Sequence, residues 1–320
     1  MDLLYLSSED IRTLSLCPSE LADSLVGAFC KRRLGEAILP AKTGMRPGWS
    51  DAFFHAMPAA LQGGLSGIKW VAGARGNAEL GLPHIMGLLI LADGQTGKPL
   101  AIMESGELTG LRTAAMSLLA ARSLARSDST RIAFIGCGLQ ARTHLAALAA
   151  EFPIRRLHAV SRSDAGAERF CRHAAALGFE AQTCREPRQA LADADIVVST
   201  VPASTELKPF LDGRWMAPGG FATMVDLGRS WTVEGMAGFD RIFTDDREQT
   251  LALKEHSPLF GAVCIAGDLG DLLTGEAPGR STPQERLAFA FPGAAIADLA
   301  AGNLALEKAR EHGLGRYLPL

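Results

Sequence analysis

The chain has 320 residues, of which 48% are hydrophobic and 21% are charged, and its net charge is −3 at pH 7. These values are typical of a globular protein with two domains or one large one, and the lack of a basic run argues against nucleic acid or a membrane surface as partners. The N-terminus has no basic region followed by an apolar one, and no apolar run approaches the roughly 20 residues of a bilayer span. We therefore expect a cytoplasmic protein.

The first part of the chain mixes helix and strand signals. A short helix is predicted at Ser8–Leu14 and a longer one at Pro18–Leu34, with proline in its first turn and Gly35 after its end. A long helix rich in Ala and Leu is predicted at Glu107–Arg126. Between these helices the sequence predicts five strands, the last two joined by a hairpin turn, at Ala37–Thr43, Ala52–Met57, Gly67–Ala72, His84–Ala92 and Pro99–Glu104.

From about residue 128 onward, strand and helix signals alternate. This βαβ alternation predicts a parallel sheet with helices on both faces. A final helix, Ala295–His312, follows Gly293, and we expect it to return to the first domain. The alternating segments are the strands Arg131–Ile135, Arg156–Ser161, Glu180–Cys184, Ile196–Val201, Phe221–Asp226 and Arg241–Thr244, and the helices Gln140–Ala150, Ala165–Leu177 and Pro187–Ala192.

A glycine-rich loop follows the strand at Arg131–Ile135 directly. It reads Gly136-Cys-Gly138-Leu139-Gln140-Ala141, which is a G-x-G-x-x-A pattern between a strand and a helix. In this context Gly136 permits a tight turn, Gly138 lets the backbone approach a pyrophosphate, and Ala141 lets the helix pack close to the strand. The free N–H groups at the helix start attract phosphate. The sequence therefore predicts a dinucleotide-binding domain.

The end of the second strand in this domain predicts the type of dinucleotide. An NAD-preferring site usually carries Asp or Glu there, whereas this chain carries Ser161-Arg162-Ser163. Because arginine pairs well with a 2′-phosphate, we expect NADP(H) to be favoured over NAD(H). The strand at Ile196–Val201 ends in Thr200-Val201-Pro202, which we expect at the nicotinamide wall; a plain buried strand is the alternative.

Six cysteines are present, and none forms a C-x-x-C pair or a zinc-type spacing. We interpret them as small buried side chains in a reducing compartment, and we expect no metal site.

Several segments together resemble the ornithine cyclodeaminase/mu-crystallin family. The stretch Leu108-Thr-Gly-Leu-Arg112-Thr113-Ala-Ala is the most specific of them. The others are Met57-Pro-Ala, Gly67-Ile-Lys69-Trp, Asn77 with Gly81-Leu-Pro, residues 91–103, the loop at 135–141, residues 267–275, and Phe291-Pro-Gly293-Ala-Ala-Ile-Ala-Asp298. The resemblance runs nearly end to end.

The resemblance implies an α/β fold with two parts. These are a Rossmann-type dinucleotide-binding domain at residues 123–294 and a mixed α/β substrate and dimerisation domain at residues 1–122, to which residues 295–320 return. It also implies a homodimer. Members of the family include ornithine and lysine cyclodeaminases, alanine dehydrogenases, reductases of cyclic imino acids and siderophore-type amino-acid dehydrogenases.

The resemblance also implies site residues. Lys69 and Arg112 correspond to the family's substrate-site cations, with Arg112 as the contact for the substrate carboxylate, and Arg112 and Thr113 also correspond to cofactor contacts. Lys69 is also a candidate to polarise the imine or carry its proton, and a snorkelling surface lysine is the alternative. Asp226 falls where cyclodeaminases carry a catalytic aspartate, with a turn-forming aspartate as the alternative. A second carboxylate contact falls on Lys42 or Arg46.

The sequence departs from the family pattern after Asp226. Cyclodeaminases commonly continue with Lys and Glu, whereas this chain has Leu227-Gly-Arg229-Ser-Trp231, and a serine common before the late glycine is replaced by Phe291. We therefore expect an NAD(P)H-dependent reductase or dehydrogenase acting at the α-carbon of an amino or imino acid. A cyclodeaminase that recycles NAD is the second hypothesis. A non-catalytic, mu-crystallin-like protein that binds NADPH and a small ligand is the third.

Overall fold

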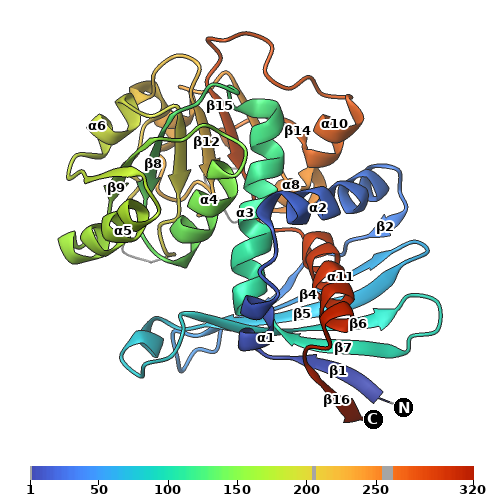
Figure 1. Cartoon of the computed structure of the whole chain (residues 1–320). Helices are drawn as coiled ribbons and strands as arrows, with labels where there is room; N and C mark the ends of the chain where they lie inside the picture. Colours follow the sequence, from blue (N-terminus) through green and yellow to red (C-terminus); the bar gives the residue numbers. More distant parts are fainter. Residues whose placement is uncertain (1, 204–206, 254–261) are drawn as a thin grey trace. The chain divides into compact units, whose positions relative to one another are not determined.

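The computed structural model describes residues 2–203, 207–253 and 262–320 (Figure 1). The chain divides into two compact units. Unit 1 comprises Met1–Arg112 together with Ala294–Leu320, and unit 2 comprises Thr113–Gly293. Helix α3 (Gly106–Leu124) begins in unit 1 and ends in unit 2. Within the described ranges, every helix falls short of the length and apolarity that a bilayer crossing requires.

Unit 1 is built on a mixed sheet with the order β16-β1-β7-β6-β5-β4-β2, and β3 also pairs with β4. Only the β1–β7 pair is parallel among the described pairs of this sheet, and β1 pairs with β16 so that the two chain ends lie together (Figure 1). The strands are β1 (Asp2–Leu6), β2 (Ala37–Ile38), β3 (Thr43–Met45), β4 (Phe53–Leu61), β5 (Leu65–Gly73), β6 (Ile85–Asp93), β7 (Pro99–Glu104) and β16 (Arg316–Pro319).

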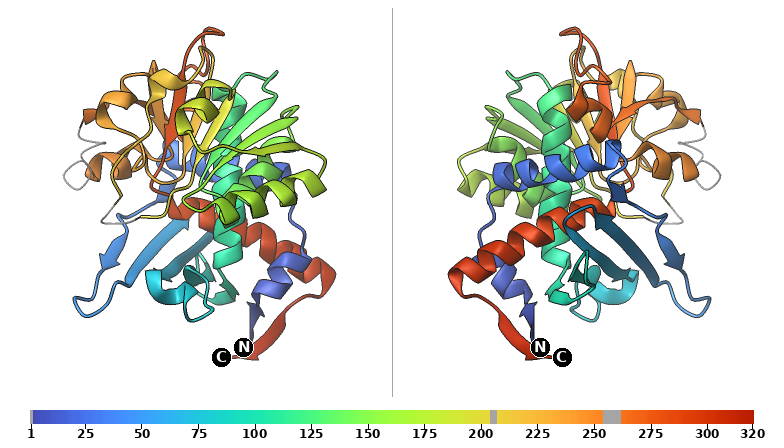
Figure 2. Two further views of the ribbon diagram at one scale, coloured as in Figure 1. Left: turned by 90° about the vertical axis from the view of Figure 1, so that its left-hand side faces the viewer. Right: turned by 90° about the vertical axis from the view of Figure 1, so that its right-hand side faces the viewer.

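Helices cover one face of this sheet. Helix α11 (Ala295–His312) packs against β4, β5 and β6, and α2 (Pro18–Arg33) packs against α11 (Figures 1 and 2). The short helix α1 (Ser8–Thr13) contacts β1 and β7, and the 3-10 helix η1 (Arg75–Ala78) follows β5. Because side chains alternate along a strand, the covered face takes every second residue. One cross-strand row on it, Met57–Lys69–Leu89–Met103, is buried throughout.

Unit 2 is built on a parallel sheet with the order β10-β9-β8-β11-β12-β15-β13-β14. The first strand of the unit, β8, lies in the interior, with β9 and β10 on one side and β11 and β12 on the other, which is the Rossmann arrangement. Its strands are β8 (Arg131–Ile135), β9 (Arg156–Val160), β10 (Glu180–Thr183), β11 (Ile196–Ser199), β12 (Phe221–Met224), β13 (Arg241–Thr244), β14 (Ile265–Asp268) and β15 (Leu287–Ala290).

Helices lie on both faces of the parallel sheet. On one face α6 (Pro187–Ala192), η2 (Gly213–Trp215) and α7 (Val233–Met236) supply residues to a core with alternate residues of β8, β11 and β12. On the other face Phe170 of α5 (Asp164–Ala176) packs edge-on against Phe134 of β8, with the ring centroids 5.0 Å apart. The remaining helices are α4 (Leu139–Ala149), α8 (Arg247–Ala252) and α10 (Leu269–Thr274). The fold is thus an α/β fold in which a Rossmann-type unit accompanies a mixed α/β unit.

Two of the predicted strands differ from the structure at a proline residue. The strand predicted at Ala37–Thr43 is broken into β2 and β3, because Pro40 lacks the N–H that a continuous ladder needs. The strand predicted to end at Met57 instead runs through Pro58 to Leu61. Pro58 lies opposite the break between β2 and β3, where β4 has no outer partner in the described sheet, so its missing donor costs little.

Candidate active site

The covered face of the unit 1 sheet carries a buried ionic cluster. The Lys69 Nζ atom donates to Oδ1 of Asp298 at 2.8 Å, and the Arg112 Nε atom donates to the same oxygen at 2.9 Å. Lys69 and Asp298 are each 2% exposed and Arg112 is 5% exposed. The three groups come from β5, α3 and α11 and together carry one net positive charge when Lys69 is protonated. Such a cluster is suited to an anionic ligand.

The burial of Lys69 rules out the alternative that it is a snorkelling surface lysine. A snorkelling lysine keeps its ammonium group in water, whereas the side chain of Lys69 is 2% exposed and lies in a row of apolar residues. Burial and the neighbouring positive charges of Arg112 and Lys42 lower the pKa of Lys69 to about 7, although Asp298 opposes this change. A lysine with this pKa exchanges its proton near neutral pH, as a general acid or base must.

Two glycines let α11 approach the sheet next to this cluster. A Cβ on Gly67, which lies on the same face as Lys69, would meet Leu299 of α11 at 2.8 Å. A Cβ on Gly302, one turn after Asp298, would meet Leu89, the cross-strand neighbour of Lys69, at 2.5 Å. Asp298 itself lies in the first turn of α11, where the helix dipole favours a negative charge. Close packing on both sides therefore holds Asp298 against Lys69.

The structure separates the two candidates for the second carboxylate contact. Lys42, just before β3, is partly buried, and its charge acts on Lys69 and lowers the pKa of that group. Arg46 is exposed, and its guanidinium lies 5.8 Å from the centroid of the Phe53 ring. Lys42 therefore belongs to the electrostatic surroundings of Lys69.

The glycine loop of unit 2 leaves room for a ligand at the start of α4. Gly136 has φ +100°, and a Cβ there would meet the side-chain oxygen of Thr200 at 2.6 Å. Gly138 precedes α4 without a side-chain cap, and a Cβ on it would meet open space. Ala141 is fully buried, whereas Leu139 is exposed. The first N–H groups of α4 thus lack a capping side chain, as an anion-binding helix start requires.

The loop follows β8, and the predicted residues at the ends of β9 and β11 belong to the two strands that flank β8 in the sheet. The Thr200 backbone N–H donates to Ile135 O at 2.7 Å, and its hydroxyl donates to Gly136 O at 3.2 Å. Val201 is partly buried and Pro202 is exposed. At the end of β9, Ser161 is partly buried, and Arg162 is exposed and forms no ion pair with any described residue.

Three further predicted residues have surroundings that bear on their roles. The Ser163 hydroxyl caps α5 by accepting from the Gly166 N–H at 3.2 Å. Two residues after Arg162 in the sequence, Asp164 forms an ion pair with Arg185 at 2.7 Å. In α3, Thr113 is buried directly after Arg112. Gln140 lies in the first turn of α4, and its Oε1 atom is buried without a hydrogen-bond partner.

Asp226 follows β12 and is held by neutral donors. Its Oδ1 atom accepts from Ser199 Oγ at 2.9 Å and from the Gly228 N–H at 3.1 Å, and its Oδ2 atom accepts from Ser230 Oγ at 2.5 Å. Trp231 Nε1 in turn donates to Ser199 Oγ at 3.0 Å. Burial raises the pKa of Asp226 to about 6 despite these hydrogen bonds. The same turn holds Leu227 at φ +58°, a strained value for a residue with a side chain.

Sequence analysis missed several residues of these clusters. Asp298 carried a signal, because it is the lone charged residue between Arg286 and Glu307. Ser199 and Ser230 gave none, because their contacts depend on the turn that follows β12. The buried His144 of α4 was also missed. Its Nδ1 donates to Gln140 O at 2.7 Å, and Nε2 accepts from Ser117 Oγ at 2.9 Å.

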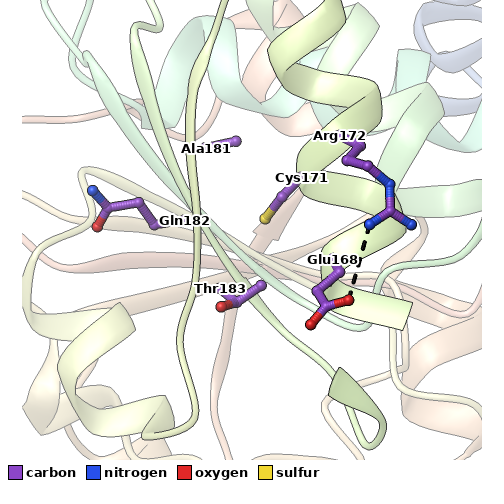
Figure 3. Close-up of a pocket in the computed structure, with 6 residues that line it drawn as sticks. All are labelled: Glu168, Cys171, Arg172, Ala181, Gln182 and Thr183. Carbon is purple, nitrogen blue, oxygen red and sulfur yellow. Dashed lines mark ion pairs between the residues drawn. The ribbon is translucent and has the colours of Figure 1, made fainter. Parts of the chain in front are cut away.

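A surface hollow of about 520 Å³ lies elsewhere in unit 2, between α5 and the edge strand β10 (Figure 3). An ion pair joins two of its lining side chains, Glu168 and Arg172, along α5. The hollow contains none of the predicted site residues. The lining of this hollow therefore adds nothing to the ionic cluster of unit 1 or to the strand-end residues of unit 2.

Comparison with known proteins agrees with this fold. The alanine dehydrogenase of Archaeoglobus fulgidus is 30% identical over 98% of this chain and 98% of its own. The solved structure of the Thermococcus litoralis Δ1-pyrroline-2-carboxylate reductase with NADH and L-proline is 30% identical, with a TM-score of 0.90 over 99% of this chain and 100% of its own. An archaeal alanine dehydrogenase dimer with bound NAD is 29% identical, with a TM-score of 0.88 over 100% of both chains.

These similarities define a two-unit α/β protein with a Rossmann-type nucleotide-binding fold. The model of the ornithine cyclodeaminase/mu-crystallin family matches residues 2–313, and the chain belongs to this family. The resemblance inferred from the sequence is thereby confirmed.

Proposed function

We propose that this protein is an NAD(P)H-dependent reductase or dehydrogenase that acts at the α-carbon of an amino or imino acid, with a cyclic α-imino acid such as pyrroline-2-carboxylate or piperideine-2-carboxylate as substrate. The observation that carries the proposal is the buried cluster in which Lys69 and Arg112 share one oxygen of Asp298. The named functions of the similar alanine dehydrogenase and pyrroline-2-carboxylate reductase support it.

In this proposal the cations of unit 1 hold the substrate carboxylate. Arg112 offers guanidinium N–H groups, which suit a carboxylate, and Lys69 adds a second charge nearby. Lys42 supplies the third cation, since its charge acts on Lys69 whereas Arg46 lies on the Phe53 ring. Positive charge concentrated in a buried site binds an anion more strongly than it would in water.

Lys69 is also the proposed proton donor. Reduction of an imine forms a C–H bond at the α-carbon and breaks the C=N double bond, so the nitrogen must gain or already carry a proton. With a pKa of about 7, Lys69 gives up a proton readily at neutral pH and regains it from water. We also propose that Asp226 takes part in this proton transfer, because its pKa of about 6 lets it exchange a proton in the same pH range.

The cofactor proposal rests on the fit of unit 2 to a dinucleotide. Gly136, Gly138 and the uncapped N–H groups of α4, from Leu139 to Ala141, would hold the pyrophosphate. Thr113, Gln140 and the segment Thr200-Val201-Pro202 complete the proposed cofactor contacts, with Ser161 and Ser163 on the ribose side. When bound, the cofactor supplies or accepts the hydride. The exposed Arg162 favours NADP(H) over NAD(H) by pairing with the 2′-phosphate.

The outer face of the unit 1 sheet supports a homodimer. On the face opposite Lys69, apolar side chains pair across the strands, Trp70 with Leu88 and Ile68 with Ile90. Trp70, Leu88 and Ile90 are 38–43% exposed, and a contiguous exposed apolar patch of this kind marks an association surface. The similar archaeal alanine dehydrogenase is a dimer. We infer that a second copy of this chain covers the patch. We also infer a cytoplasmic location, which the six free cysteines support, although they are exposed or partly exposed and the prediction that they are buried is wrong.

The test is the change in absorbance at 340 nm with purified protein, either NADPH or NADH, and a panel of substrates. The panel contains five- and six-membered cyclic imino acids, pyruvate with ammonia, and ornithine with catalytic NAD, and released ammonia is measured in parallel. Consumption of NADPH by an imino acid supports the proposal. Ammonia from ornithine without net cofactor change would instead identify a cyclodeaminase. Tight NADPH binding without turnover would favour the binding protein.

A further inference from the structure

We propose that Asp298 is a positioning residue of the candidate active site, which fixes the Lys69 ammonium and the Arg112 guanidinium at one point and supplies the negative charge that offsets them. This inference rests on the proposed function, in which the two cations bind the substrate.

The geometry of the two contacts carries the first step. Both donors meet the same atom, Oδ1, at 2.8 Å and 2.9 Å. Two positive groups that converge on one buried oxygen would repel each other without it, and this repulsion is large where water is excluded. The carboxylate is therefore what allows both cations to occupy adjacent positions in the free protein.

The backbone that carries Asp298 is itself closely packed. Gly67 and Gly302 let α11 lie against β5 and β6 on both sides of the contact. The backbone at Asp298 therefore cannot move away from β5 without moving the helix. The second oxygen, Oδ2, is buried and has no hydrogen-bond partner. Because most buried polar atoms in proteins have a hydrogen-bond partner, this unpaired oxygen is an exception that points to a role beyond stabilising the fold.

The charges around Lys69 give the second step. Burial lowers the pKa of Lys69 most, Arg112 and Lys42 lower it further, and Asp298 raises it. His55 is a further titratable residue on the same sheet face, paired with Val71 next to the Lys69 row. If the charge of Asp298 is removed, the repulsion from the two cations is no longer opposed. Lys69 should then lose its proton well below neutral pH, and it would be neutral when the substrate arrives.

The test is a titration of Lys69 by NMR in protein labelled with [ε-13C]lysine, in which the Lys69 resonance is assigned by its absence in Lys69→Met. We expect Asp298→Asn, which keeps the shape and removes the charge, to lower the Lys69 midpoint by about one pH unit or more. The matched control is Glu20→Gln. It removes the ion pair that Glu20 of α2 forms at 2.9 Å with Lys308, a residue of the helix that carries Asp298, and it should leave the Lys69 midpoint unchanged. An unchanged midpoint in folded Asp298→Asn would overturn the inference.

A second measurement decides the matter if Asp298→Asn does not fold. The wild-type protein is labelled with [γ-13C]aspartate and titrated. One carboxyl resonance must shift with the midpoint of Lys69, and this step must vanish in Lys69→Met; if no resonance does so, the inference fails. Neither titration uses a substrate. The absence of imino-acid turnover would therefore refute the proposed function while leaving the result on Asp298 readable.

Discussion

Two buried aspartates, Asp298 in unit 1 and Asp226 in unit 2, are used in opposite ways. Asp226 accepts from three neutral donors through both oxygens, and its surroundings raise its pKa to about 6. Asp298 meets two cations through one oxygen and leaves the other without a partner. The first pattern is a satisfied polar network that holds a strained turn. The second is a charged cluster with excess positive charge, and an anionic substrate would complete it.

The largest expected effect lies in the charged cluster. Lys69→Met should reduce the turnover of an imino acid by about 10³-fold, because it removes the proposed general acid and one carboxylate contact. The Kd for NADPH, measured by the fluorescence of the cofactor, should stay within about threefold of the wild-type value, because the cofactor site is unchanged. Lys69→Arg is the matched control that keeps the charge but not the proton exchange, and it should also be slow. Turnover of Lys69→Met within tenfold of wild type would remove Lys69 from the mechanism.

The next largest effect concerns the cofactor. Arg162→Glu should raise the KM for NADPH by about 10²-fold and change the KM for NADH far less, because only NADPH carries the 2′-phosphate. Steady-state kinetics with each cofactor measure this ratio. Arg185→Gln is the control, because it removes another exposed arginine of unit 2, which is paired with Asp164. Equal changes for both cofactors would contradict the NADP(H) preference.

The buried His144 of unit 2 should make the free energy of unfolding depend on pH. Burial lowers the pKa of His144 to about 4, so the folded state resists a proton that the unfolded chain binds below about 6.5. The free energy of unfolding should therefore fall as the pH drops from 6.5 to 4, by up to about 3 kcal/mol from this group. Urea unfolding of the wild type and of His144→Asn should show a smaller pH dependence in the variant. His312→Asn, at an exposed position, should keep the wild-type dependence.

The smallest expected effect is at Asp226. Asparagine retains the hydrogen bonds to Ser199 and Gly228 but cannot ionise, so Asp226→Asn should reduce turnover by about tenfold with little loss of stability. Ser230→Ala is the matched variant. It removes a hydrogen bond that lowers the pKa of Asp226, so the acid limb of the rate profile should move to higher pH. Wild-type turnover and an unchanged profile in both variants would leave Asp226 with the turn-forming role alone.

Local patterns predicted the parallel sheet of unit 2 well, because each βα segment carries its own signal. The glycine loop lies between β8 and α4 as expected. Strands that depend on distant partners were missed. β1 and β16 come from opposite ends of the chain and pair with each other. β14 and β15 are only four residues long, and the sequence analysis predicted no helix between them. Predicted ends were also too long at Val201 and Asp226, because the strand ladders stop at Ser199 and Met224.

The site residues that lie in family motifs could be predicted from the sequence. The contacts that depend on the packing of distant elements could not. Lys69 and Arg112 stand in recognisable segments, but their meeting on Asp298 joins residues 229 and 186 positions apart. No periodicity or spacing encodes that contact. It depends on the close approach of α11, which the two small residues Gly67 and Gly302 permit.

The central claim is that Lys69 delivers a proton during reduction of a cyclic imino acid. The most direct test is the pH dependence of kcat/KM for NADPH-driven reduction of pyrroline-2-carboxylate, since this parameter reports groups of the free enzyme. Because the pKa values of Asp226 and Lys69 are about 6 and about 7, the rate should be highest between these two pH values and fall about tenfold for each unit above pH 7, as the protonated lysine is lost. A rate that is flat or rising between about pH 7 and 9 would contradict the account.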